Sequence, residues 1–343
     1  MPGDKRLKTI EIICGILLVM GLVISIQKSF RRAPSPPRVT IAESRESKTN
    51  PVDTSFLDSV VSQVTSAEKS ATANKNPGSS IKSVSSPNKT AQASGDVITA
   101  DEYLVGNLDT GKIYFQKNAN DTEPIASISK LFASIVINKY IDPNSTIVIA
   151  SSSVTGYEQA GDVYPGESFT AQDLEKGMLL ISSNDAALSF ANNFGYVNFM
   201  SDMNQVASSL HLTKTHFTDP SGLSPYNVSS ADDLFAFARY LYKSQPALLG
   251  ITRTPEFSLS TTTDHGAHDF VNIDPFVYDP HYLGGKTGRT DAAGETMLSL
   301  FNLPDGNGDI IPVAVVVLHS NQDTRQIDSS MLIVNVLSAI KAL

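Results

Sequence analysis

Three short motifs hold most of the chemistry that this sequence offers: Ser127-Ile-Ser-Lys130, Ser182-Ser-Asn184 and Lys286-Thr-Gly288. Acyl transfer by a serine needs a nucleophile beside a base, a group that protonates the leaving amine, and a donor or cation that holds the substrate. The motifs contain these parts in this order. Each motif is weak evidence by itself, because Ser-x-x-Lys also begins at Ser25, Ser66, Ser79 and Ser86.

Ser127 and Lys130 are three residues apart at the start of an expected helix, so both side chains lie on one face. Ser127 at the helix N-terminus would lie where the helix dipole favours an oxyanion. Lys130 accepts a proton only when it is neutral, a form that burial or a second cation such as Lys286 favours. The alternative, an N-terminal serine followed by a solvent-facing lysine, stays open.

The second motif falls between two expected helices. There, the hydroxyl of Ser182 would pass a proton to a leaving amine, and the amide of Asn184 would hold a peptide oxygen of the substrate. The alternative is a simple capping turn, for which serine and asparagine are both common.

The third motif follows Gly284-Gly285 and precedes Arg289. Glycine in or beside a strand often marks close approach of another backbone, and an extended peptide substrate could add to such an edge, so Gly288 is a candidate substrate-binding residue. Lys286 and Arg289 would attract a terminal carboxylate, with Thr287 as a hydrogen-bond donor. A turn of small residues is the alternative.

Residues 96–343 are predicted to form one α+β domain with a mostly antiparallel sheet and helices packed on it, because strands begin and end this part. Expected strands are Tyr103–Asn107, Ile113–Gln116, Glu295–Asn302 and Ile311–His319. Expected helices are a segment after Ser127, then Asp173–Ser182, Asp185–Asn193, Phe199–Leu210, Ala231–Lys243 and Ser329–Leu343.

The N-terminal part predicts a short cytoplasmic tail (1–8), a transmembrane anchor (9–27) and a flexible linker (28–95). The anchor is almost wholly apolar and close to the ~20 residues that cross a bilayer as a helix. A cleaved signal peptide is the alternative, although no small-x-small cleavage site follows. The linker is rich in Ser, Thr, Pro, Lys and Asn, and its mean reach is on the order of 45 Å.

Composition excludes several classes of protein. The formal net charge of −9 argues against nucleic acid as a partner, because phosphate binding needs a basic surface. The single cysteine, Cys14, excludes an internal disulfide, and we interpret it as a small apolar residue rather than a lipid attachment site. His265 and His268 are the only close histidine pair, and no His-Glu-x-x-His is present, so we expect neither metal nor cofactor.

Together the motifs resemble the D-alanyl-D-alanine carboxypeptidases, the low-molecular-mass penicillin-binding proteins. The resemblance covers nearly all of residues 96–343. It extends to these further segments: Asn107-Leu-Asp-Thr-Gly111, Glu123-Pro-Ile-Ala-Ser127, Tyr164-Pro-Gly-Glu167, Asp173-Leu-Glu-Lys-Gly177, Thr215-His-Phe-Thr-Asp-Pro-Ser-Gly-Leu223 and Asp232-Asp-Leu234. It implies a beta-lactamase/transpeptidase-like fold with a helical subdomain.

The resemblance also implies residue roles. Ser127 forms the acyl-enzyme, Lys130 accepts its proton, and Ser182 relays that proton with help from Lys286. Asn184 binds the substrate amide, and Lys286 and Thr287 hold its carboxylate. The backbone N–H groups of Ser127 and Arg289 form the oxyanion hole. The substrate would be a peptidoglycan stem peptide ending in D-Ala-D-Ala, with beta-lactams as covalent inhibitors.

Three alternatives remain beside a carboxypeptidase. A class A beta-lactamase needs a glutamate downstream of the second motif, and the sequence has none between Lys176 and Pro255. An endopeptidase or transpeptidase acting on cross-links needs the same residues. A catalytically silent cell-wall-binding protein would be expected to have lost part of the set. Because peptidoglycan lies outside the cytoplasmic membrane, we expect a single-pass bacterial membrane protein with its catalytic domain on the outer face.

Overall fold

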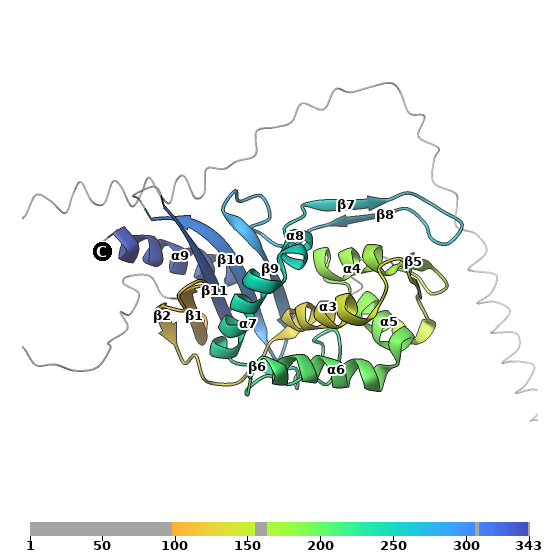
Figure 1. Cartoon of the computed structure of the whole chain (residues 1–343), viewed down its shortest axis with the longest axis horizontal. Helices are drawn as coiled ribbons and strands as arrows, with labels where there is room; N and C mark the ends of the chain where they lie inside the picture. Colours follow the sequence, from red (N-terminus) through yellow and green to blue (C-terminus); the bar gives the residue numbers. More distant parts are fainter. Residues whose placement is uncertain (1–97, 155–162, 306–308, 342–343) are drawn as a thin grey trace, which may run out of the picture. The chain divides into compact units, whose positions relative to one another are not determined.

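A five-stranded antiparallel sheet is the centre of the fold in the computed structural model, which describes residues 98–154, 163–305 and 309–341 (Figure 1). The strand order is β2-β1-β11-β10-β9, so strands from both ends of the domain pair with each other. The bounds are β1 (Glu102–Asn107), β2 (Ile113–Lys117), β9 (Tyr282–Thr290), β10 (Gly294–Pro304) and β11 (Ile310–Ser320).

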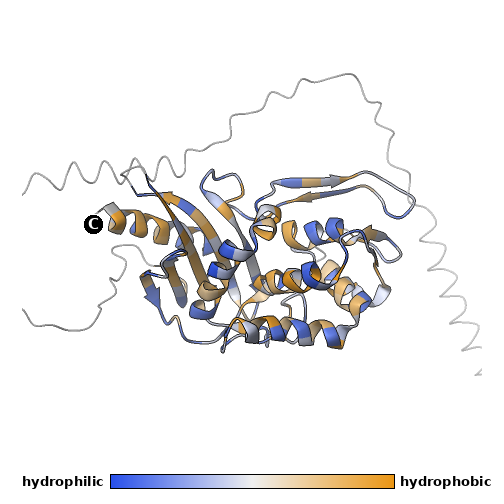
Figure 2. Ribbon diagram, viewed as in Figure 1, coloured by the Kyte–Doolittle hydropathy of each residue, from blue (hydrophilic) through white to orange (hydrophobic). Residues whose placement is uncertain are grey.

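The sheet is buried on both faces, and β11 shows why. Its odd-numbered residues from Val313 to Val317 pack in one apolar cluster with helix α9 (Arg325–Lys341). Its even-numbered residues from Ala314 to Leu318 pack in the other cluster, against the remaining helices. A strand with both faces buried reads as a continuous apolar run rather than an alternating one. Figure 2 shows this as hydrophobic colour along β10 and β11.

The segment between β2 and β9 forms the other helices. Figure 1 shows α4, α5 and α6 gathered beyond β9, on the side of the sheet opposite to β2. The bounds of these helices are α3 (Ser129–Tyr140), α4 (Ala171–Leu180), α5 (Asn184–Phe194), α6 (Tyr196–Ser209), α7 (Ala231–Ser244) and α8 (Pro246–Thr252). Two 3-10 helices are η1 (Ala126–Ile128) and η2 (Ser151–Ser153).

Helix α3 lies in the middle of these helices, since every residue from Ser129 to Ile137 is buried. Phe132 stacks on Phe237 of α7 with ring centroids 3.8 Å apart and tilts against Phe217 at 4.7 Å. Such aromatic packing fixes the first turns of α3 relative to the sheet. The residues that α3 presents at its N-terminal end are therefore held rigidly.

Three two-stranded sheets complete the described fold. They pair β3 (Glu123–Pro124) with β6 (Val228–Ser229), β4 (Thr146–Val148) with β5 (Ser168–Thr170), and β7 (Glu256–Leu259) with β8 (His268–Val271). The first pair brings the segment before Ser127 beside the segment after Asp219, which matters for the site below.

The expected fold class is confirmed as a mixed α/β arrangement with an antiparallel sheet and packed helices. Helix α8 and the β7–β8 hairpin were not expected, and His268, expected in a polar loop, is buried in β8 with Nε2 3.1 Å from Glu167 Oε1. The predicted anchor (9–27) and linker (28–95) lie outside the described residues. Among the described residues, no helix has the length and apolar character that crossing a membrane requires.

Candidate active site

Ser127 lies in the tight 3-10 turn that leads directly into α3, at the N-terminal end of the helical segment as expected. The turn is η1, and α3 begins two residues later at Ser129. Ala126 in this turn has φ +47°, a left-handed conformation that non-glycine residues adopt at a cost. This left-handed residue directly precedes the nucleophile, and the helical segment continues from Ser127 into α3.

Lys130 is fully buried, and its amine lies among three oxygens. Nζ is 2.7 Å from Ser127 Oγ, 2.8 Å from Asn184 Oδ1 and 2.7 Å from the carbonyl oxygen of Ser221. An ammonium ion would donate to all three oxygens. A neutral amine would donate to Asn184 and Ser221 and accept from the Ser127 hydroxyl, which is the arrangement that a general base requires.

The three residues of the second motif have different structural surroundings. Ser183 is the N-cap of α5, and its side chain accepts a hydrogen bond from the N–H of Ala186 at 3.2 Å. Asn184 is the first residue of α5 and points its Oδ1 atom at Lys130. Ser182 has φ +61° and lines the cleft that contains Ser127. The capping interpretation therefore applies to Ser183, while Ser182 and Asn184 line the cleft with Ser127.

Strand β9 is the free edge of the sheet, and the third motif lies within it. A Cβ atom built on Gly288 would be 2.8 Å from the backbone nitrogen of Ser127, so only glycine fits there. On the next strand, Thr296 Oγ1 donates to the carbonyl oxygen of Ile125 at 3.1 Å. These two contacts hold β9 and β10 against the turn of Ser127.

Lys286 is a buried residue of β9. Its Nζ donates to the carbonyl oxygen of Thr287 at 2.9 Å, and the side chain is buried. Burial lowers the pKa of Lys286 to about 7, opposed by the Asp274 carboxylate and reinforced by the Arg325 guanidinium. Asp274 and Arg325 therefore act on this pKa in opposite directions.

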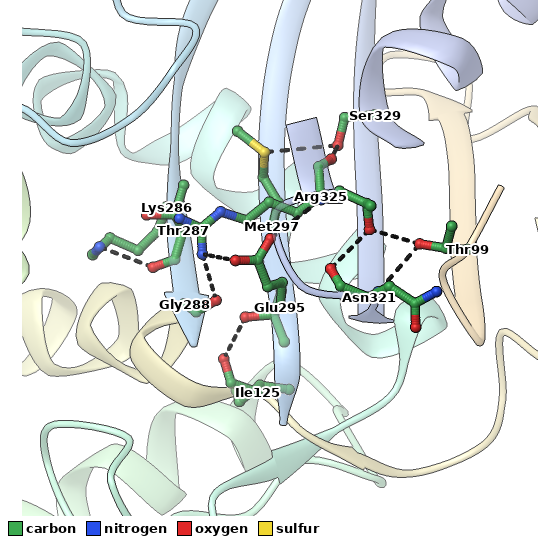
Figure 3. Close-up of polar contacts among 12 residues, drawn as sticks. Thr99, Ile125, Lys286, Thr287, Gly288, Glu295, Met297, Asn321, Arg325 and Ser329 are labelled. Atoms are coloured by element: carbon green, nitrogen blue, oxygen red, sulfur yellow. Dashed lines mark hydrogen bonds and ion pairs between the residues drawn. The ribbon is translucent and has the colours of Figure 1, made fainter. Parts of the chain in front are cut away.

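Arg325 is a site residue that the sequence did not reveal. It begins α9, far along the chain from the third motif, and its guanidinium reaches across to β9 (Figure 3). One nitrogen donates to the carbonyl oxygen of Gly288 at 3.0 Å and lies 3.9 Å from Glu295 Oε1. No local motif marks this arginine, which reaches Gly288 because α9 follows β11 and lies beside the neighbouring strands of the sheet.

These elements enclose a cleft of ≈ 180 Å³. Its lining, taken from the part of the chain that the structure describes, contains two guanidinium groups and no carboxylate, which suits an anionic substrate group. The lining residues are Ser127, Ile181, Ser182, Asn184, Gly222, Leu223, Ile273, Thr287, Gly288, Arg289, Thr290 and Arg325. Lys130 and Lys286 lie behind this surface.

Comparisons with known proteins agree with this geometry. The family profile of D-alanyl-D-alanine carboxypeptidases matches residues 88–321. A D-alanyl-D-alanine carboxypeptidase from Mycobacterium tuberculosis is 34% identical over 204 residues, 58% of this chain and 69% of that protein. A D-alanyl-D-alanine endopeptidase from Escherichia coli is 31% identical over 234 residues, 66% of this chain and 73% of that protein.

Solved structures show the same fold. The structure of a D-alanyl-D-alanine carboxypeptidase from Mycobacterium tuberculosis is similar with a TM-score of 0.65 and 28% identity, over 74% of this chain and 96% of that one. The Streptomyces K15 DD-transpeptidase is similar in fold alone, with a TM-score of 0.63 and 20% identity over 71% and 99% of the two chains. The profile spans more than half of the sequence and includes all three motifs, so the chain belongs to the D-alanyl-D-alanine carboxypeptidase family of peptidases.

Proposed function

We propose that this protein is a serine-type carboxypeptidase that removes the terminal D-Ala from peptidoglycan stem peptides. The observation that carries the proposal is the 2.7 Å contact between Ser127 Oγ and Lys130 Nζ at the floor of a cleft with two guanidinium groups. A serine becomes nucleophilic when a base accepts its proton as it attacks, and this contact is within the required reach.

The reaction starts when Ser127 Oγ attacks the carbonyl carbon between the two D-Ala residues and Lys130 takes the hydroxyl proton. The developing oxyanion accepts from the N–H groups of Ser127 and Arg289. Ser182 then relays the proton from Lys130 to the leaving nitrogen, the C–N bond breaks, and free D-Ala departs. A water molecule hydrolyses the Ser127 ester and regenerates the enzyme.

Substrate binding uses the edge of β9 and the cationic part of the cleft. The stem peptide adds to this edge as an extended strand, beside Gly288, which lines the cleft. Thr287 donates to the terminal carboxylate, and Arg289 and Arg325 supply positive charge. Lys286, buried behind Thr287, adds its charge in its protonated form. Asn184 holds a peptide carbonyl of the substrate through its Nδ2 group.

Cleavage of cross-links is the second candidate function. It is favoured by the Escherichia coli relative, whose name is D-alanyl-D-alanine endopeptidase. The same nucleophile, base and oxyanion hole serve both reactions, because each breaks an amide bond on the carboxyl side of a D-Ala residue. Only the size of the leaving group differs.

The proposed location follows from the substrate, which lies outside the cytoplasmic membrane. Residues 9–27 would anchor the protein, residues 28–95 would tether the domain, and the domain would act on the outer face. A protease added to intact spheroplasts should then remove the domain. A domain that is protected from outside until the membrane is lysed would contradict this topology.

The activity is tested with two substrates in parallel, an acyl-D-Ala-D-Ala peptide and a cross-linked peptide dimer. Released D-Ala is measured for the first substrate, and monomer peptides are measured by mass spectrometry for the second. Release of D-Ala that is lost in Ser127→Ala supports the carboxypeptidase. Cleavage of the dimer alone supports the endopeptidase, and turnover of neither substrate supports the silent cell-wall-binding protein.

A further inference from the structure

His216 pairs with β6 through an isolated β-bridge, and the loop between them is held by one carboxylate, that of Asp219. Asp219 Oδ1 accepts hydrogen bonds from the N–H of Ser221 at 2.7 Å, from the hydroxyl of Ser221 and from the N–H of Gly222 at 2.9 Å. Oδ2 accepts from the N–H of Ser224 at 2.8 Å. Four donors around one carboxylate fix the backbone of this loop.

One peptide group in this loop connects Asp219 to the catalytic lysine. Its N–H, on Gly222, donates to Asp219 Oδ1, and its C=O, on Ser221, accepts from Lys130 Nζ at 2.7 Å. A peptide group that donates to a carboxylate is polarised, and its oxygen becomes a stronger acceptor. The negative charge of Asp219 therefore acts on Lys130 through a single planar unit.

Asn227 holds the same loop against α3. Its Nδ2 atom donates to the carbonyl oxygen of Asp219 at 2.8 Å and to Ser129 Oγ at 3.1 Å. Its Oδ1 atom accepts from the N–H groups of Thr218 at 2.8 Å and Asp219 at 3.1 Å. Ser129 lies between Ser127 and Lys130 in the first motif, so the loop is fixed directly to the residues that it serves.

Gly222 shows how closely the loop and the nucleophile turn fit. It has φ +90°, and a Cβ atom on it would be 2.0 Å from the carbonyl oxygen of Ala126 and 2.9 Å from the nitrogen of Ser127. The backbone of Gly222 therefore packs directly against the turn that carries the nucleophile, with no room for a side chain between them.

We infer that Asp219 is a positioning residue for acyl transfer, which holds and polarises the Ser221 carbonyl that orients the amine of Lys130. With two N–H bonds of the neutral amine directed at Asn184 and Ser221, the lone pair is left directed at the Ser127 hydroxyl. After proton transfer, the same carbonyl stabilises the ammonium ion. This inference assumes the acyl-enzyme chemistry proposed above.

The test compares Asp219→Asn with Asp233→Asn in the full chain. Asp233 is a matched control, because its Oδ2 atom also accepts from a loop backbone N–H, that of Lys214 at 2.7 Å, but away from the cleft. Acylation of Ser127 by a fluorescent penicillin is followed by stopped flow across pH 5 to 10. The maximal acylation rate, the half-saturating concentration and the acidic limb of the pH profile are recorded separately.

We expect Asp219→Asn to lower the maximal acylation rate roughly 10- to 100-fold, the effect of one hydrogen bond to a charged group, with little change in the half-saturating concentration. The acidic limb should move to lower pH, because a lost negative charge disfavours protonated Lys130. Asp233→Asn should match the wild type in all three. Equal rates in both variants, or a slower Asp219→Asn with an unmoved acidic limb, would overturn the inference.

Two further measurements keep the test decisive. In Asp219→Asn, the new amide group could face the N–H of Ser224 and prevent folding, which thermal unfolding would detect. In that case the variant Asp219→Ser is used in its place. An NMR titration of the Lys130 side chain needs no turnover, and its pKa should be lower in the Asp219 variant. An unlabelled wild-type Ser127 would contradict the proposed function, whereas an unchanged Lys130 titration would contradict the role of Asp219.

Discussion

Gly288 and Ser127 are so close that a Cβ atom on the glycine would lie 2.8 Å from the backbone nitrogen of the serine. The turn that carries Ser127 therefore packs against strand β9 and against Gly222 of the loop that contains Asp219. This contact places the N–H of Ser127 beside the edge to which a substrate would add. It also makes the site sensitive to a single methyl group.

We expect Gly288→Ala to reduce acylation by about 100-fold or more, the cost of losing one oxyanion-hole donor. The added methyl group would push β9 away from the N–H of Ser127. Gly250→Ala is the matched control, because nothing lies within 4 Å of its Cβ position in α8. The measurement is the rate of labelling by a fluorescent penicillin. Labelling of Gly288→Ala at the rate of Gly250→Ala would show that the close contact has no role in acylation.

The position of Arg325 predicts that catalytic efficiency depends on the terminal carboxylate of the substrate. Replacing it by glutamine should lower kcat/KM for an acyl-D-Ala-D-Ala peptide roughly 10- to 100-fold, the effect of one charge-assisted hydrogen bond. The effect should be much smaller for the same peptide with an amidated C-terminus.

The control for Arg325→Gln must address its ion pair with the buried carboxylate of Glu295. The double variant Arg325→Gln/Glu295→Gln removes both charges, so it separates lost substrate binding from an unpaired carboxylate. Equal losses for the acid and amide substrates in both variants would exclude carboxylate recognition by Arg325.

Glu102 in β1 predicts a pH dependence of stability. Its side chain is 2% exposed, and neither carboxyl oxygen has a hydrogen-bond partner among the described residues. Burial, followed by the carboxylates of Glu123, Asp121 and Asp101, raises its pKa from 4.5 to about 8. The folded state therefore binds this proton more tightly, and the associated stability is lost as the pH rises from about 4.5 to about 8.

Glu102→Gln should remove this dependence. Relative to the wild type, its free energy of unfolding should increase by on the order of 3 kcal/mol between pH 5 and pH 8. Urea unfolding at several pH values measures this difference, and Glu256→Gln on the exposed end of β7 serves as the control. A constant difference between Glu102→Gln and the wild type would contradict the raised pKa.

The regular elements of the domain could be predicted because their patterns are local. The helix expected at Ala231–Lys243 is Ala231–Ser244, where Ser230 caps the start and the apolar residues recur on one face. The strand expected at Ile311–His319 is Ile310–Ser320, a continuous apolar run. Helix α8 was missed because it has only seven residues, beginning at Pro246, too few for a clear period.

The parts of the site that could not be predicted come from backbone conformation and from the pairing of distant segments. Ala126 and Ser182 both have a left-handed backbone, but alanine and serine are not residue types that indicate this conformation. The carbonyl of Ser221 has no sequence signature at all, because every residue has a carbonyl. Arg325 reaches the site only because β11 leads α9 back to the edge of β9.

The central claim is that Ser127 carries the acyl group, and peptide mapping of the penicillin-treated protein tests it most directly. The full-length wild type and the Ser127→Ala variant are incubated with penicillin, digested and compared by mass spectrometry. The account predicts one penicilloyl adduct, on the peptide that contains Ser127, and no adduct in Ser127→Ala. An adduct on another residue, or one that persists in Ser127→Ala, would contradict it.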